Sequence, residues 1–202
     1  TWRFVMPNLC SNDLVVVGPY EDVKRFVDAV TSEDGSISIL DTLYPVPQDL
    51  KNTVADGGYG SDESKQARDA NVEKYGYPDW YEWCCDKWGT KWGDYDDASM
   101  VCRNDDPPED KNRLARAFIT FTSAWCPPDS GIAYISTLFP TILFDLRYEE
   151  EGMGFHGVLQ VRNGERLEEL CVEYIQPSEM FYDWARERYE DLIEESADNS
   201  DG

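Results

Sequence analysis

The chain predicts an α+β protein in which an antiparallel sheet carries helices on one face. Short segments typical of strands recur along the 202 residues, and helical periodicity separates them in two places. Hydrophobic residues make up 41 % of the chain and aromatic residues 13 %. Disordered acidic proteins are poor in aromatic residues. We therefore expect a packed core beneath an acidic surface.

The first part of the chain predicts a strand, a helix and a second strand. Residues 14–17 are apolar and end at a Gly-Pro turn pair, and a helix follows from Tyr20. Residues 37–40 alternate like a strand, and the polar, Gly-rich residues 52–66 predict a mobile surface loop. A short helix is expected from Pro78. The first helix has one apolar face, formed by Val23, Phe26, Val27 and Val30.

The second part predicts another strand, a helix and a run of strands. Residues 117–122 are β-branched and aromatic, which is typical of a strand, and a helix follows Pro128. The pair Asn163-Gly164 predicts a tight hairpin. The other strands are expected over residues 141–148, 155–161 and 167–174.

Strand–helix–strand followed by strand–helix–strand is the split βαβ arrangement, which predicts a ferredoxin-like fold. We expect this domain over residues 1–175, with an aromatic-rich insertion at about residues 44–112. An acidic helix is expected over residues 176–195 and a disordered tail over 196–202. Since no apolar run is long enough to span a bilayer and the start does not resemble a signal peptide, we expect a cytoplasmic protein.

The charge restricts the class of partner. The chain has 41 Asp and Glu against 18 Lys and Arg, for a net charge of −23. A surface this negative repels nucleic acid and anionic membranes, and it attracts the basic surfaces by which proteins hold DNA and RNA. We therefore expect a basic protein surface as the partner, with no direct binding of nucleic acid or membrane. Salt adaptation, in which the charge only solubilises the protein, is a further alternative.

The expected C-terminal helix carries the candidate partner-binding face. Its acids recur every three to four residues, and neighbouring side chains on a helix lie about 5–6 Å apart, close to the spacing of phosphates along DNA. Such a helix could occupy a phosphate-binding groove, although an ordinary solvated face would have the same pattern. The face comprises Glu187, Glu190, Asp191, Glu194 and Glu195.

A tryptophan-rich segment offers a second candidate site. Its side chains could form a pocket that stacks a base or a peptide side chain, with a lysine holding an anion. Alternatively, the same rings pack the insertion against the sheet. The candidate pocket residues are Trp83, Trp88, Lys91 and Trp92.

No catalytic or metal site is expected. The chain has one histidine, His156, on an expected outward strand position, and it has no GxSxG, Walker or GxGxxG motif. Residues 94–97 are acid-rich but lack the order of an EF-hand loop. The six cysteines include no CxxC pair, which favours reduced structural thiols. We expect a non-enzymatic protein without a cofactor. The alternative is a binder of a small molecule or nucleotide, or an enzyme, that uses the tryptophan-rich insertion as its pocket.

Several motifs resemble those of one family. Residues 6–12 (MPNLCSN), 88–92 (WGTKW) and 122–128 (TSAWCPP) are similar to segments of YubB-like plasmid and phage proteins, and the likeness extends to about residue 157. Leu9 and Cys126 depart from the family pattern. The resemblance implies a ferredoxin-like domain and a mobile-element origin, and it implies no activity. Together with the charge, it predicts an anti-defence or inhibitory protein that mimics nucleic acid.

Overall fold

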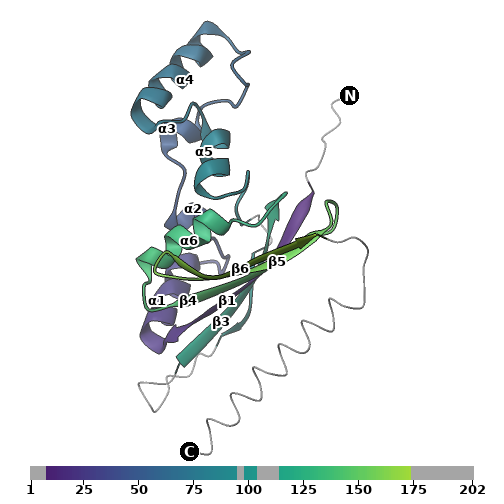
Figure 1. The fold of residues 1–202 in the computed structure, drawn as a ribbon. Helices are drawn as coiled ribbons and strands as arrows, with labels where there is room; N and C mark the ends of the chain where they lie inside the picture. Colours follow the sequence, from purple (N-terminus) through teal and green to yellow (C-terminus); the bar gives the residue numbers. More distant parts are fainter. Residues whose placement is uncertain (1–7, 95–97, 104–113, 174–202) are drawn as a thin grey trace, which may run out of the picture. The chain divides into compact units, whose positions relative to one another are not determined.

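The computed structural model describes residues 8–94, 98–103 and 114–173, and in them one antiparallel sheet of six strands (Figure 1). The strands lie in the order β2-β3-β1-β4-β5-β6. They are β1 (Leu9–Pro19), β2 (Ser99–Arg103), β3 (Leu114–Ala124), β4 (Leu143–Glu150), β5 (Phe155–Arg162) and β6 (Glu165–Glu173). The chain divides into two compact units, residues 1–172 and 173–202, and the elements below belong to the first.

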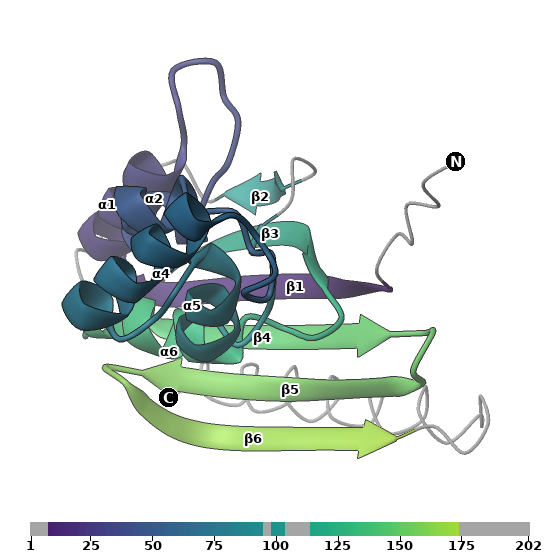
Figure 2. The same cartoon turned by 90° about the horizontal axis from the view of Figure 1, so that it is seen from above.

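The topology is that of a ferredoxin-like fold, as predicted. Along the chain, β1, α1 (Tyr20–Val30), β2, β3, α6 (Asp129–Leu138) and β4 give strand–helix–strand twice. Strand β1 is central, since Leu14 pairs with Ile119 on β3 and with Leu146 on β4. The β5–β6 hairpin extends the sheet beyond β4 (Figure 2).

The second strand of this pattern is not where the sequence predicted it. Residues 37–40 form no strand: Ile37 makes one isolated bridge with Thr31, and Leu40 begins the short helix α2 (Leu40–Leu43). The second strand is β2, which lies within the range predicted for the insertion. Four alternating residues fit a strand or a short turn equally well, and a carboxylate far along the chain, Asp94, accepts from the backbone N–H groups of Ile39 and Leu40.

The predicted mobile loop over residues 52–66 is also wrong at its end, where a helix begins. Helix α4 (Asp62–Tyr75) starts after Ser61, whose side chain accepts from the Ser64 N–H, and stops at Gly76 in the left-handed conformation. This helix buries one residue, Asn71, so it lacks the apolar stripe that identifies a helix in sequence. Two further helices, α3 (Gln48–Lys51) and α5 (Trp80–Lys87), flank it in the chain.

The core lies between the sheet and helices α1 and α6, and buried residues of α2, α3 and α5 extend it. All four apolar residues predicted on α1 are buried. Phe26 is fully buried and meets Phe139 and Phe144 edge to face, with both ring centroids 5.3 Å away. Alternate residues along β1 and β3 are buried, which gives the sheet one core-facing side. The predicted acidic helix (176–195), the tail and residues 104–113 lie outside the described residues.

Candidate functional site

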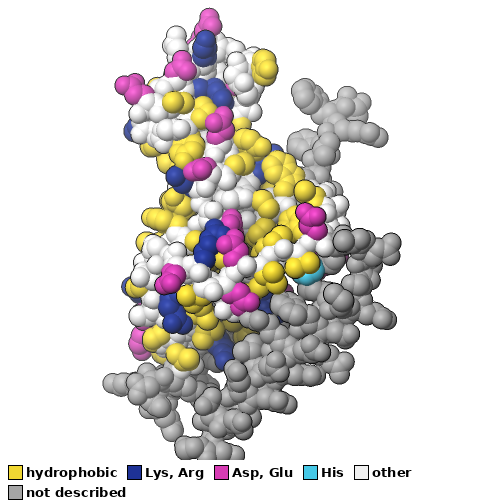
Figure 3. Space-filling view, viewed as in Figure 1, with side chains coloured by type: hydrophobic (Ala, Val, Ile, Leu, Met, Phe, Trp, Pro, Cys, Tyr) yellow, Lys and Arg dark blue, Asp and Glu magenta, His cyan; other side chains and the backbone are white. Residues whose placement is uncertain are grey.

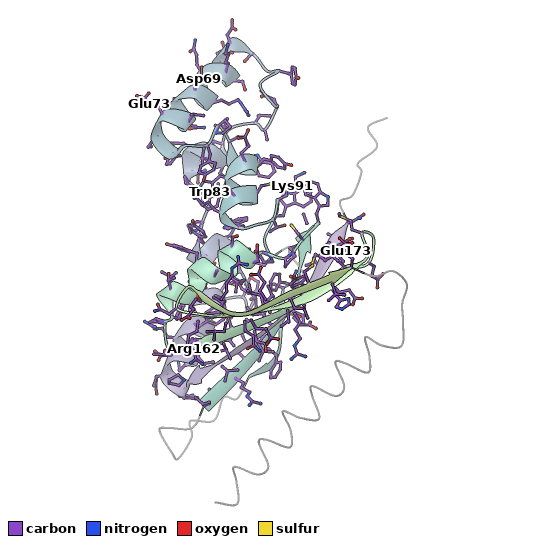
Figure 4. The ribbon with its side chains drawn as sticks, in the orientation of Figure 1. Asp69, Glu73, Trp83, Lys91, Arg162 and Glu173 are labelled. Carbon is purple, nitrogen blue, oxygen red and sulfur yellow. The ribbon has the colours of Figure 1, made fainter. Side chains whose placement is uncertain are left out.

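The exposed acids of the described residues are spread over several elements, including α1, α4, α5 and β6. The five acids of the predicted partner-binding face, Glu187 to Glu195, lie outside the described residues. Exposed carboxylates on α4 include Glu63, Asp69 and Glu73, and Figure 4 labels the last two. Figure 3 shows magenta acidic side chains at the α4 end and around the sheet, often beside dark-blue basic ones.

Ion pairs neutralise part of this charge locally. Asp28, Asp41 and Asp49, for example, each lie within 4.0 Å of a lysine ammonium. The pairs cannot remove the surplus, because even complete pairing of all 18 bases would leave 23 carboxylates. Surface pairs of this kind contribute little stability. The chain therefore keeps a large excess of negative charge after pairing.

One arginine of the insertion lies close to three of its acids. Arg68, whose side chain is 11 % exposed, lies 3.8 Å from Asp56 and 3.7 Å from Glu82, and it donates to Asp79. Asp79 also begins α5, because its carboxylate accepts from the N–H groups of Tyr81 and Glu82. These acids are structural. They hold the segment around Asp56 against α4 and α5, where the sequence predicted a mobile loop.

Two of the predicted pocket residues pack the core. Trp83 and Trp88 are 6 % and 4 % exposed, and their rings meet edge to face at 5.7 Å. Trp83 also contacts Tyr44 at 5.1 Å, and the Trp88 indole N–H donates to the Tyr44 carbonyl at 2.9 Å. This is the packing role that the sequence left open beside the pocket.

The other two predicted pocket residues, Lys91 and Trp92, belong to a half-buried aromatic cluster. The Lys91 ammonium lies 4.4 Å from the Trp92 ring centroid, 5.1 Å from that of Trp125 and 5.7 Å from that of Tyr81. Such cation–π contacts hold the ammonium over the rings. Trp125 has a φ of 67°, a strained conformation for a bulky residue. Sequence reasoning named neither Trp125 nor Tyr81 as a site residue, although Trp125 lies in the TSAWCPP motif.

The three motifs that carried the family resemblance meet at this cluster. The Thr90 hydroxyl donates to the Ala124 carbonyl at 2.6 Å, and the Asn12 amide donates to the Ser123 hydroxyl at 2.9 Å. The Trp125 N–H donates to the Asn8 carbonyl at 2.9 Å. Segments more than 30 residues apart in the chain are thereby joined at one end of β1 and β3.

The chemistry of this end does not favour nucleophilic catalysis. Cys10 is buried, and its burial raises the pKa of the thiol to about 12. Burial also raises the pKa of the Cys126 thiol, which donates to the Gly89 carbonyl. Burial therefore disfavours the thiolate, which is the nucleophilic form, at both cysteines.

Two other positions considered in the sequence analysis, His156 and Asp94, lie in surroundings that shift their pKa. His156 was expected to point outward, but its side chain is 9 % exposed; burial lowers its pKa, and the carboxylate of its cross-strand neighbour Glu149 partly opposes that shift. Burial raises the pKa of Asp94. Its carboxylate accepts from the N–H of Leu40, the first residue of α2, although the two residues are 54 positions apart in the chain. Among the described residues, no three His, Cys, Asp or Glu side chains are placed to share a metal ion. No described helix is long and apolar enough to cross a membrane.

One solved structure and one family model are similar to this chain. The crystal structure of a protein api92 from Yersinia pseudotuberculosis is similar at a TM-score of 0.48 and 12 % identity, covering 86 % of this chain and 100 % of that chain. None of the curated proteins matches the chain. The sequence model described as the ferredoxin-like domain in Api92-like protein matches residues 87–190, which is just over half of the 202 residues. The chain therefore belongs to the family of Api92-like proteins with this ferredoxin-like domain.

Proposed function

We propose that this chain is a non-enzymatic interaction protein, encoded by a phage or plasmid, that acts in the host cytoplasm. It blocks a basic, nucleic-acid-binding host or defence protein by presenting carboxylates at the positions where that protein binds phosphates. The observation that supports the proposal is a net charge of −23 on a chain whose described part has an ordered apolar core. The YubB-like resemblance of its motifs supports the mobile-element origin.

The proposed mechanism is electrostatic. Carboxylates fixed on a folded scaffold lose little conformational freedom on binding, and a field of one sign accelerates encounter with a basic groove. Association should therefore be fast and should weaken as salt rises. Binding of nucleic acid and of the chain to the target should be mutually exclusive.

Displacement from DNA tests the proposal. A bacterial lysate is loaded on DNA–cellulose, and the purified chain is passed over it at low salt. We expect release of a discrete basic protein in complex with the chain. Changing Glu187, Glu190, Asp191, Glu194 and Glu195 to Gln or Asn should reduce the release at least about tenfold, since charge pairs dominate such contacts.

The result that contradicts the proposal is equal release by the chain and by the neutralised variant, or no release at any concentration. Thermal unfolding at low and high salt separates simple salt adaptation. A chain that unfolds at low salt and refolds at high salt, without displacing any protein, would have charge for solubility only.

The cluster around Lys91 favours a second candidate function, the binding of a small planar anion such as a nucleotide. Three separated motifs converge there, and an ammonium lies among indole rings that can stack on a base. Titration with AMP should quench tryptophan fluorescence, and Lys91→Met should abolish the quenching. Lys87→Met, which removes a lysine paired with Asp86, is the matched control. Unchanged fluorescence at millimolar AMP would exclude this candidate.

A further inference from the structure

We propose that the outer edge of strand β6, which has no strand beside it among the described residues, is a docking site for an extended, basic segment of the partner, which adds a strand to the sheet. The inference rests on the proposed function, from which it takes the basic partner. It adds a second place of contact, in addition to the acids at 187–195, and the geometry of recognition there.

Strand β6 is the last strand of the described sheet. Among the described residues it has a neighbour on one side only, β5. A terminal strand presents backbone N–H and C=O groups that another strand can use. Strand β6 is nine residues long and contains no proline, so its whole length can pair.

The opposite edge of the sheet is built differently. Strand β2 has five residues, and its pairing with β3 shifts register between Met100 and Cys102. Short strands and bulges are means by which proteins protect sheet edges from further pairing. Of the two edges, β6 is the one suited to accept a strand.

Apolar side chains of β6 are unusually exposed. The exposed fractions are 52 % for Leu167, 40 % for Leu170 and 40 % for Val172. Because side chains alternate along a strand, Leu167 lies on one face, and Leu170 and Val172 lie on the other. A strand added to this edge would find an apolar cross-strand neighbour on both faces.

The negative charge of β6 indicates which kind of segment would pair with it. Glu165, Glu168 and Glu169 outnumber Arg166, which already donates to Glu169 and, at 2.9 Å, to Asp129 on α6. A second copy of β6 would bring like charges together, which destabilises a pair of strands. A segment in which Lys or Arg alternates with β-branched residues would gain both charge pairs and packing. The occupant is therefore a basic strand of another protein.

A peptide provides the first test. The probe is a fluorescent, acetylated nine-residue peptide in which Lys alternates with Val and Thr, and its binding to the full chain is followed by anisotropy. The control has the same side chains but is N-methylated along its backbone, so it keeps the charge and loses the donors. We expect the control to bind at least about tenfold more weakly, as removal of several backbone hydrogen bonds requires. Equal binding of both peptides would overturn the proposal.

Matched charge variants provide the second test. One variant removes three charges from β6 through Glu165→Gln, Glu168→Gln and Glu169→Gln. The matched variant removes three charges from α4 through Glu63→Gln, Asp69→Asn and Glu73→Gln. We expect the β6 variant to bind the peptide about tenfold more weakly and the α4 variant less than about threefold more weakly, since exposed charges act mainly at short range. Circular dichroism checks that both variants fold.

The outcomes distinguish the inference from the function on which it rests. Equal weakening by both variants would overturn docking at β6 while leaving the acidic surface as the binding site. A chain that displaces no protein from DNA yet binds the peptide at β6 would contradict the proposed function alone. If the chain sediments as a dimer that the β6 charge variant strengthens, a second copy is the occupant and the proposal is wrong.

Discussion

The sheet with its flanking helices and the segment between α1 and β2 are stabilised by different interactions. The sheet buries fully apolar side chains such as Phe26, Phe144 and Leu146 in continuous contact. The intervening segment adds buried residues such as Leu40, Leu50 and Trp88 to the same core, and its outer part around α4 is held by Arg68 and its acids. One chain therefore combines an apolar core, to which part of this segment contributes, with a polar outer part around α4, and four predictions test this difference.

The largest effect is expected in the apolar core. Phe26→Ala should lower the free energy of unfolding by about 3–5 kcal/mol, because it removes a fully buried ring between Phe139 and Phe144 and leaves a cavity. Urea unfolding followed by far-UV circular dichroism measures it. Phe26→Leu, which keeps most of the volume, should lose less than half as much. A loss below about 1 kcal/mol for the alanine variant would show that this core is not continuous.

The next effect is expected in the insertion. Arg68→Met should cost about 2–3 kcal/mol locally, since it leaves the 3 % exposed Asp79 carboxylate without its cation. Hydrogen exchange should accelerate around Asp56 and in α4, with little change in β1. Arg68→Lys should lose less, because it keeps the charge without the planar fork. Equal acceleration in β1 would show that sheet and insertion unfold as one unit.

A smaller effect is expected where the two regions join. Trp88→Phe keeps an aromatic ring but removes the indole donor to the Tyr44 carbonyl. We expect a loss of about 1–2 kcal/mol, the cost of leaving a buried acceptor without its partner. Thermal unfolding provides the measurement, and Trp92→Phe, at a half-buried position, is the control. A larger loss for Trp92→Phe would place the junction elsewhere.

The smallest effect concerns pH and tests the sheet itself. Burial lowers the pKa of His156, so the folded state binds a proton less readily than the unfolded state. Its contribution is present above the ordinary histidine pKa and is lost as pH falls through that value towards the lower folded pKa. Stability should therefore decrease between pH 7.5 and 5.5, and His156→Gln should reduce this decrease. An identical pH profile for the variant would contradict this role of His156.

Patterns of period two and 3.6 predicted the elements of the sheet well. The apolar face of α1, strand β3 and the hairpin at Asn163-Gly164 all follow from local sequence, and both hairpin residues have the positive φ that such a turn requires. The fold class followed from the order of these elements. Helix α4 was not predicted because its residues are polar on nearly every side. Strand β2 was not predicted because five residues are too few to show a clear alternation of apolar and polar side chains.

By itself, the sequence determined the class of fold, the excess of negative charge and the three motifs, because these depend on composition and on neighbours along the chain. Tertiary structure decided where the motifs meet, which tryptophans are buried and which strands form the two edges of the described sheet. Asp94 caps a helix more than 50 residues away, and Lys91 meets Trp125 from another loop. Such contacts depend on how distant segments pack, and no local pattern specifies them.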